Sequence, residues 1–214
     1  LDRTSTSQET FWYNDTYTVA QFGQYQKVAS NQFDWNNDIL VNYKKQISDD
    51  FKIDLSAGAN QRIFERNRLQ GQGNNFTIEN FFALSNTQQP LATEELERFE
   101  VQSLYGLAEF SYKNAIFLNA TARNDWSSTL PEANRSYFYP SVGLTAVVTD
   151  LVDVSNSPLS FLKLRANWAE VGNDTDAFSL SRRADIRFGS LDINPTQPNA
   201  DLRPESTQSL ELGF

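Results

Sequence analysis

The side chains best suited to chemistry in this sequence are carboxylates, because its 214 residues include no Cys, no His and no Met. Glu94, Glu95, Glu97 and Glu100 gather within residues 93–100. A catalytic carboxyl pair needs two different environments that separate the two pKa values, and a run of solvated glutamates provides only one. We therefore expect a solvated acidic loop at this place rather than a catalytic site.

Two other short stretches have residue types that bind ligands. Residues 173–176 (Asn-Asp-Thr-Asp) are rich in oxygen ligands, but Ca²⁺ takes about six to eight oxygens, and the run lacks the glycine and distal glutamate of an EF-hand loop. Residues 71–73 (Gly-Gln-Gly) lie near several arginines, but a phosphate-binding loop needs a helix after it, and no helical pattern follows. We expect a polar turn after Gly172 and a flexible loop around Gly71.

The composition excludes several classes of protein. Without Cys there is no disulfide framework, thiolate zinc site or cysteine nucleophile, and without His there is no Ser-His-Asp triad or His-ligated metal. The 18 Lys and Arg against 27 Asp and Glu give a net charge of −9, which argues against a nucleic-acid binder because phosphate contacts need a basic surface. No apolar run approaches the roughly 18 residues of a membrane helix. We expect no enzyme, no metal site and no cofactor.

Alternation of apolar and polar residues is the dominant pattern, and it predicts an all-β fold. Over residues 115–126, Leu118 and Ala120 share one face with Trp126, while Asn119 and Arg123 share the other. Such patterns predict about eight strands, at Tyr17–Lys27, Ile39–Gln46, Phe51–Ile63, Gln102–Tyr112, Ala115–Trp126, Tyr139–Val148, Phe161–Val171 and Ser206–Phe214. In the glutamate-rich segment Thr93–Glu100 we expect a short helix.

The predicted strands are longer than those of soluble sheets. Most run for roughly 9 to 13 residues, against a mean of about 5–6 in soluble proteins, and a tilted strand that crosses hydrocarbon needs about 9–11. The connections alternate, with short ones at 47–50 and 113–114, a moderate one at 149–160, and long polar ones at 65–101, 127–136 and 172–205. Outer-membrane barrels have short periplasmic turns and long extracellular loops, so the pattern favours an antiparallel transmembrane β-barrel.

In such a barrel the apolar face meets lipid and the charged face meets the lumen. We expect Trp126, Phe138 and Trp168 near the outer strand ends as part of an aromatic girdle, the alternative being core or chance positions. The charged residues expected on the lumen wall are Glu109, Arg123, Asp125, Lys163, Arg165 and Glu211. Their cations could steer an anionic solute, but we favour pairing with carboxylates across strands.

Aromatic residues also occur in the stretches expected to be loops. Trp35, Phe81, Phe82 and Tyr137 could stack on a sugar or a peptide, because aromatic rings offer a large and rigid contact surface. The alternative, which we favour, is that these rings pack loop against loop and hold the extracellular side together.

Four motifs follow one another in the second half of the chain. They are R-x-D-x-S-S from Arg123, Y-P-S from Tyr139, L-K-L-R-x-x-x-x-x-x-G-N from Leu162 and L-x-P-E-x-x-x-x-x-E-x-G from Leu202. In this order they resemble the barrel of the SusC/RagA-type TonB-dependent transporters of Bacteroidetes. The resemblance is specific over Leu104–Phe214, whereas residues 1–102 rely on alternation alone.

The resemblance implies that residues 1–214 are one piece of a barrel of about 22 strands in a bacterial outer membrane. It implies that a plug domain, a TonB box and further strands lie elsewhere in the protein. It also implies uptake of an oligosaccharide or peptide, energised by TonB–ExbB–ExbD through that other part, under a SusD-like surface lipoprotein. The start at Leu1 and the end inside an expected strand fit a fragment or a processed chain.

Two alternatives stay open. A soluble all-β carbohydrate-binding domain, built as a sandwich, predicts that Leu118, Leu144, Val148 and Leu164 are sealed in a core, whereas the transmembrane reading turns them to lipid. A self-contained eight-stranded outer-membrane barrel predicts that the first and last strands pair with each other.

Overall fold

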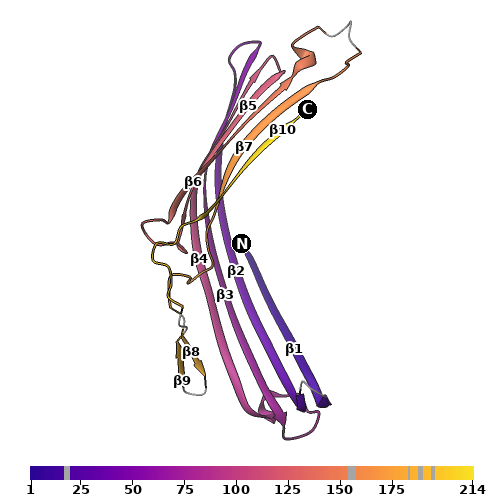
Figure 1. The fold of residues 1–214 in the computed structure, drawn as a ribbon, viewed down its shortest axis with the longest axis vertical. Helices are drawn as coiled ribbons and strands as arrows, with labels where there is room; N and C mark the ends of the chain where they lie inside the picture. Colours follow the sequence, from indigo (N-terminus) through magenta and orange to yellow (C-terminus); the bar gives the residue numbers. More distant parts are fainter. Residues whose placement is uncertain (17–19, 154–157, 183, 188–189, 194–195) are drawn as a thin grey trace. The chain divides into compact units, whose positions relative to one another are not determined.

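The computed structural model describes residues 1–16, 20–153, 158–182, 184–187, 190–193 and 196–214. One sheet has eight strands in the order β1-β2-β3-β4-β5-β6-β7-β10 (Figure 1). Their bounds are β1 Asp2–Thr16, β2 Ala20–Gln46, β3 Phe51–Phe76, β4 Thr87–Tyr112, β5 Ile116–Ser127, β6 Ser136–Val147, β7 Lys163–Asn173 and β10 Glu205–Gly213. Strands β8 (Ala184–Arg187) and β9 (Ser190–Ile193) form a separate hairpin, and two short 3₁₀ turns, η1 (Leu84–Asn86) and η2 (Val148–Asp150), complete the elements.

The described chain divides into two compact units. The first unit comprises Leu1–Asn36 and Ile63–Phe99, and the second unit comprises Asn37–Arg62 and Glu100–Phe214. Strands β2, β3 and β4 contribute residues to both units. Among the described residues, no helix has the length and apolar character needed to cross a membrane.

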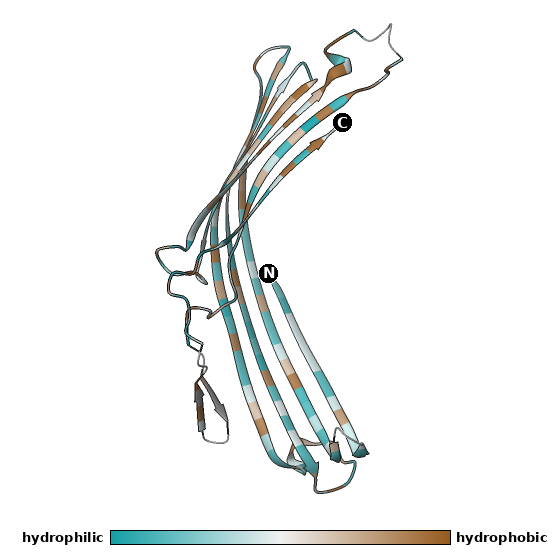
Figure 2. Ribbon diagram, viewed as in Figure 1, coloured by the Kyte–Doolittle hydropathy of each residue, from teal (hydrophilic) through white to brown (hydrophobic). Residues whose placement is uncertain are grey.

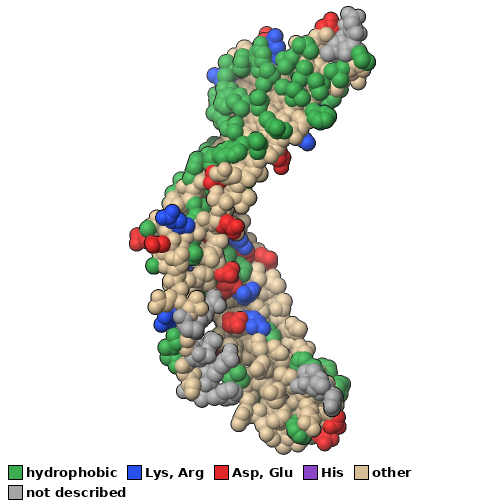
Figure 3. Space-filling view, in the orientation of Figure 1, with side chains coloured by type: hydrophobic (Ala, Val, Ile, Leu, Met, Phe, Trp, Pro, Cys, Tyr) green, Lys and Arg blue, Asp and Glu red, His purple; other side chains and the backbone are tan. Residues whose placement is uncertain are grey.

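One face of the second unit is apolar and bare. The register pairs Leu118 with Leu144 and Ala120 with Val142, and places Trp168 opposite Val142, so these residues share that face. Leu118, Leu144 and Leu164 are 39%, 47% and 45% exposed, and no second sheet among the described residues covers them. Figure 2 shows the alternation as brown and teal bands along the strands, and Figure 3 shows apolar side chains gathered over β5, β7 and β10.

This bare face rules out the soluble sandwich, because a sandwich buries its leucines between two sheets. Val148, the fourth residue of that test, is half-buried in η2. The self-contained eight-stranded barrel is also wrong, since β1 and β10 stand at opposite ends of the strand order and do not pair among the described residues. The predicted antiparallel barrel segment is confirmed.

Short turns join the strands at one end of the second unit, as predicted. Between β2 and β3 the Ile47 amide donates to the Phe51 carbonyl at 2.8 Å. Between β4 and β5, Lys113 and Asn114 both have positive φ (53° and 52°), and the Ala115 amide donates to the Tyr112 carbonyl at 3.0 Å. Two successive positive φ values give the type I′ turn, whose twist matches that of the flanking strands.

The first unit is a sheet with polar side chains on both faces. Strand β1 pairs with β2 from Asp2↔Asp34 to Thr16↔Ala20. Ion pairs join neighbouring strands, with Arg68 to Glu95 at 3.2 Å, Arg98 to Glu65 at 3.1 Å, Lys27 to Glu9 at 2.9 Å and Arg66 to Glu97. The hydrogen bond from Lys27, reinforced by its charge, lowers the pKa of the Glu9 carboxyl. Charges on both faces suit a sheet that stands in water.

Several predictions for the first unit were wrong. The long loop expected at 65–101 is mostly strand, and only residues 77–86 separate β3 from β4. The helix expected at Thr93–Glu100 is extended chain within β4, because Glu95 and Glu97 pair with arginines on β3. The flexible loop around Gly71 and the acidic loop are therefore both strand.

The predicted number of eight strands matches the main sheet because two errors cancel. Tyr17–Lys27 and Ile39–Gln46 were expected as two strands, but their described residues belong to the single strand β2. Strand β1 was missed, as was the β8–β9 hairpin inside the long connection at 172–205. Residues 17–19 lie outside the described part of the chain.

Aromatic rings pack together beside the β3–β4 connection of the first unit. The Phe82 ring lies 4.5 Å from that of Phe11, 5.1 Å from that of Tyr13 and 5.7 Å from that of Phe76. The buried Asn86 holds the β3–β4 connection, since its amide donates to the carbonyls of Ile78 (2.8 Å) and Phe81 (2.7 Å). Packing of loop against strand therefore accounts for Phe82.

Candidate functional site

The face opposite the apolar one carries every residue predicted for the lumen wall. The register sets Glu109 opposite Asn119, Arg123 opposite Tyr105 and Tyr139, Asp125 opposite Ser103 and Tyr137, Lys163 opposite Val147, Arg165 opposite Thr145, and Glu211 opposite Asn167. We call this surface of the second unit the polar face. Of the six wall residues, Arg123 and Asp125 form an ion pair, and the others lie on β4, β7 and β10.

Asp125 is the centre of a hydrogen-bonded cluster at one end of the polar face. Its carboxylate, in a residue only 5% exposed, accepts from Arg123 Nε at 2.7 Å and from the Tyr139 hydroxyl at 2.6 Å. Arg123 Nη2 also donates to Ser103 Oγ at 2.8 Å. Arg123 forms an ion pair with a carboxylate as predicted, but the partner, Asp125, lies on the same strand rather than on a neighbouring one. The hydrogen bonds that cross between strands involve the hydroxyl groups of Ser103 and Tyr139.

The cluster continues to β2 and β3 through Tyr105. The Arg123 guanidinium lies 5.7 Å from the centre of the Tyr105 ring, and the Tyr105 hydroxyl donates to Asp38 Oδ1 at 2.7 Å. The ring lies directly over Gly58, where a Cβ would stand 2.3 Å from Tyr105 Cζ. We call Asp38, Ser103, Tyr105, Arg123, Asp125 and Tyr139 the polar network.

Sequence reasoning found Arg123 and Asp125 but missed the rest of the polar network. A signal for one member was present, because Tyr105 interrupts the alternation of β4 by placing a large ring on the polar side. Gly58 could not be recognised from the sequence, since its role depends on the ring that β4 lays across β3.

Substitution of Gly58 tests how tightly the polar network is held. We expect Gly58→Ala to displace the Tyr105 ring, break its hydrogen bond to Asp38 and cost about 1–3 kcal/mol of unfolding free energy. Gly106→Ala is the matched control, because a Cβ there meets only the Ser56 carbonyl at 3.7 Å. Urea unfolding of the full-length protein in detergent measures both variants, and equal midpoints would contradict the tight contact.

A second hydroxyl cluster surrounds Asp174, directly after β7. The Asp174 carboxylate accepts hydrogen bonds from the Ser127 hydroxyl and from Thr129 Oγ1 (3.2 Å), and Ser127 and Thr129 are almost fully buried. In the oxygen-rich run at 173–176, Asn173 ends β7 and irregular chain follows, and Asp174 fastens the β5–β6 connection; the turn predicted after Gly172 begins later, at residue 177. Among the residues that the structure describes, no group of three acidic side chains suits a metal ion.

Two of the four aromatic residues predicted for loops lie in strands. Trp35 belongs to β2, and Tyr137 belongs to β6, where its ring stacks on Tyr139 at 5.9 Å. Tyr137 also covers Gly172 on the adjacent strand, so the ring fits over a residue that lacks a side chain. Phe81 lies in the β3–β4 connection as predicted, with 55% exposure, beside the packed Phe82.

The apolar face bears aromatic residues at both ends. Trp126 and Phe138 are 36% and 60% exposed. Trp126 pairs with Ser136 and Phe138 pairs with Asn124, so the two aromatic residues are diagonal neighbours near the ends of β5 and β6. Trp168 is opposite Val142, farther along the sheet, and the girdle stays a prediction. Phe51 and Tyr112, with ring centres 4.8 Å apart, flank the short turns and were not predicted.

Comparisons with known proteins agree with this architecture. The family model described as "TonB dependent receptor-like, beta-barrel" matches residues 2–214. The TonB-dependent receptor P26 of Formosa agariphila is 25% identical over 195 residues, which cover 84% of this chain and 20% of that protein.

Solved structures share the fold. The structure of the RagAB peptide transporter matches with a TM-score of 0.80 and 16% identity over 98% of this chain and 24% of that one. The RagAB peptide importer in its open-open state matches with a TM-score of 0.81 and 18% identity over 99% and 24%. The chain therefore spans about a fifth of the curated relative (20%) and a quarter (24%) of the solved chains.

Proposed function

Because this chain belongs to the TonB-dependent receptor-like β-barrel family, whose members are outer-membrane transport receptors and not enzymes, we propose that it forms part of the wall of a TonB-dependent nutrient importer. The observation that carries the proposal is the pair of unlike faces on the second unit. One face is apolar and bare, and the other bears the polar network and the remaining charged wall residues.

The proposal requires further strands from the rest of the protein. Among the described residues β1 pairs with β2 from Ala20 to Asp34, so within this part of the protein Ile39–Gln46 form one edge of the second unit and β10 forms the other. Unpaired backbone groups in lipid cost several kcal/mol each, which only closure of the barrel avoids. We place the remaining strands of a barrel of about 22, the plug and the TonB contact in other parts of the full-length protein.

The polar face then lines the lumen, where the wall residues Glu109, Lys163, Arg165 and Glu211 and the polar network meet the solute. The exposed aromatic residues of the first unit, Phe81 among them, contact the solute or a surface lipoprotein lid. The relatives named as RagAB are a peptide transporter and importer. That similarity supports peptides as the solute, with oligosaccharides as the other class.

Uptake by cells tests the proposed function. In a strain that lacks this protein, the full-length chain should restore accumulation of either labelled peptides or labelled oligosaccharides, and an uncoupler of the proton gradient should abolish it. The control is a full-length variant without its TonB contact, which should insert into the membrane but not accumulate solute. Accumulation that persists in that variant would contradict TonB-dependent import.

A further inference from the structure

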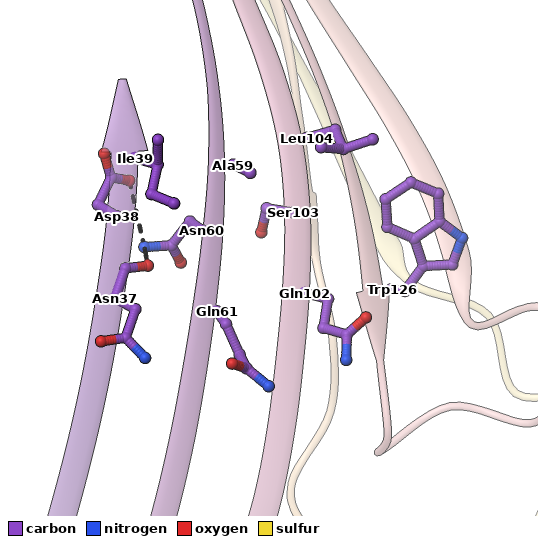
Figure 4. Close-up of a pocket in the computed structure, with 10 residues that line it drawn as sticks. All are labelled: Asn37, Asp38, Ile39, Ala59, Asn60, Gln61, Gln102, Ser103, Leu104 and Trp126. Atoms are coloured by element: carbon purple, nitrogen blue, oxygen red, sulfur yellow. Dashed lines mark hydrogen bonds between the residues drawn. The ribbon is translucent and has the colours of Figure 1, made fainter. Parts of the chain in front are cut away.

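The apolar face of the second unit contains an open depression of about 760 Å³ at the border between apolar and polar residues (Figure 4). Ala59 on β3 lies between the larger side chains of Ile39 on β2 and Leu104 on β4. Ile39 and Leu104 are 71% and 56% exposed, so this part continues the apolar band. The small side chain at position 59 therefore leaves a groove between two projecting aliphatic ones.

The polar side of the depression includes the amides of Gln61 and Gln102, which are held by Glu100 in the neighbouring hollow. Glu100 Oε1 accepts a hydrogen bond from Gln61 Nε2 at 2.7 Å and another from Gln102 Nε2 at 2.9 Å. The shared carboxylate fixes the direction of both amides, and among the described residues it leaves their two carbonyl oxygens for hydroxyl donors. Trp126 completes the rim with an exposed indole ring.

This arrangement suits a sugar better than a phosphate. Amide oxygens accept from hydroxyl groups, and an indole ring offers a flat apolar surface to a pyranose. A phosphate would meet the negative charge of Asp38, which lines the depression. The neighbouring hollow of about 390 Å³ shares Gln102 and Trp126 and adds Arg135, whose charge is offset by Glu132 at 3.8 Å.

We propose that the depression binds one saccharide-headed lipid of the outer leaflet. Its acyl chain lies along the groove over Ala59, and its sugar rests on Trp126 within reach of Gln61 and Gln102. The inference rests on the outer-membrane placement of the apolar face, with which the groove is continuous, and it does not depend on the imported solute.

Lipid retention by the full-length protein tests the site. The protein, exchanged into an amine-oxide detergent, is incubated with diglucosyl diacylglycerol or with phosphatidylcholine of the same acyl chains, and the lipid that stays bound is counted by native mass spectrometry. We expect the glycolipid to be retained preferentially. The double variant Gln61→Leu/Gln102→Leu should lower glycolipid retention about tenfold, because two hydrogen bonds are lost, and leave phosphatidylcholine unchanged.

Two matched variants separate the site from general effects. Gln208→Leu removes an amide that contacts Glu170 at 3.4 Å on the same face and does not line the depression, and it should change nothing. Ala59→Phe fills the groove and should weaken retention of both lipids. Free maltose should not displace the glycolipid, because the acyl chain supplies much of the contact.

Three results would overturn the proposal. They are equal retention of the two lipids by the unaltered protein, a loss in Gln208→Leu as large as in the double variant, and displacement by free maltose. Failure to retain either lipid would count against the membrane placement itself, whereas lipid binding without headgroup preference would remove only this site and leave the import proposal intact.

Discussion

Replacing Val142 by arginine is expected to remove most of the folded protein from the outer membrane. Val142 is 43% exposed on the apolar face, between Ala120 and Trp168, well away from both ends of β6. An arginine on the lipid face near the bilayer midplane costs about 2–4 kcal/mol, and the cost falls towards the interfaces. Because proteins are stable by only about 5–15 kcal/mol, the loss is large.

The matched control is Asn119→Arg, which places the same side chain on the polar face. Asn119 lies on β5 opposite Glu109 and Gly143, so the new guanidinium meets a carboxylate rather than lipid. The heat-modifiable fraction of the full-length protein in purified outer membranes measures assembly of both variants. Equal yields from Val142→Arg and Asn119→Arg would show that the apolar face does not meet lipid.

This pair of variants also shows why the second unit could be predicted from the sequence. A strand between lipid and water must alternate, so Leu118 and Leu144 reveal their face in the sequence alone. The first unit has no such constraint. Its strands carry polar residues on both faces, and the run around Glu95 and Glu97 has no period of two. The arginines that hold this run extended lie about thirty residues earlier, on β3.

For the candidate site, the sequence predicted which face each residue lies on but not which residues contact one another. Successive side chains of a strand point to opposite faces, so odd and even positions could be assigned to faces from the sequence. This assignment put Arg123 and Asp125 on one face with Glu109, and the register confirms that face. Contacts between strands depend on the pairing register, which the alternation within one strand does not determine. The hydrogen bonds from Tyr139 to Asp125 and from Tyr105 to Asp38 could therefore be found only from the structure. The groove at Ala59 is a further case, since a small residue forms a depression only where its neighbours project.

The polar network yields the second large expected effect, on removal of its central carboxylate. Asp125→Ala leaves the Arg123 guanidinium without its ion-pair partner and the Tyr139 hydroxyl without its acceptor. Loss of one partner from a buried pair costs about 3–5 kcal/mol. The Arg123 side chain is 36% exposed, so water screens part of this penalty, and we expect about 2 kcal/mol of lost unfolding free energy.

A double-mutant cycle distinguishes the ion pair from simple loss of packing. Arg123→Met keeps an unbranched side chain over the Tyr105 ring but removes the charge, and combined with Asp125→Ala it removes both members of the ion pair. We therefore expect the double variant to be more stable than Asp125→Ala alone, by about 1 kcal/mol. Urea unfolding of the four full-length proteins gives the coupling free energy. A double variant that loses the sum of the two single losses would show that Arg123 and Asp125 act independently and that the network is held by its hydroxyl contacts.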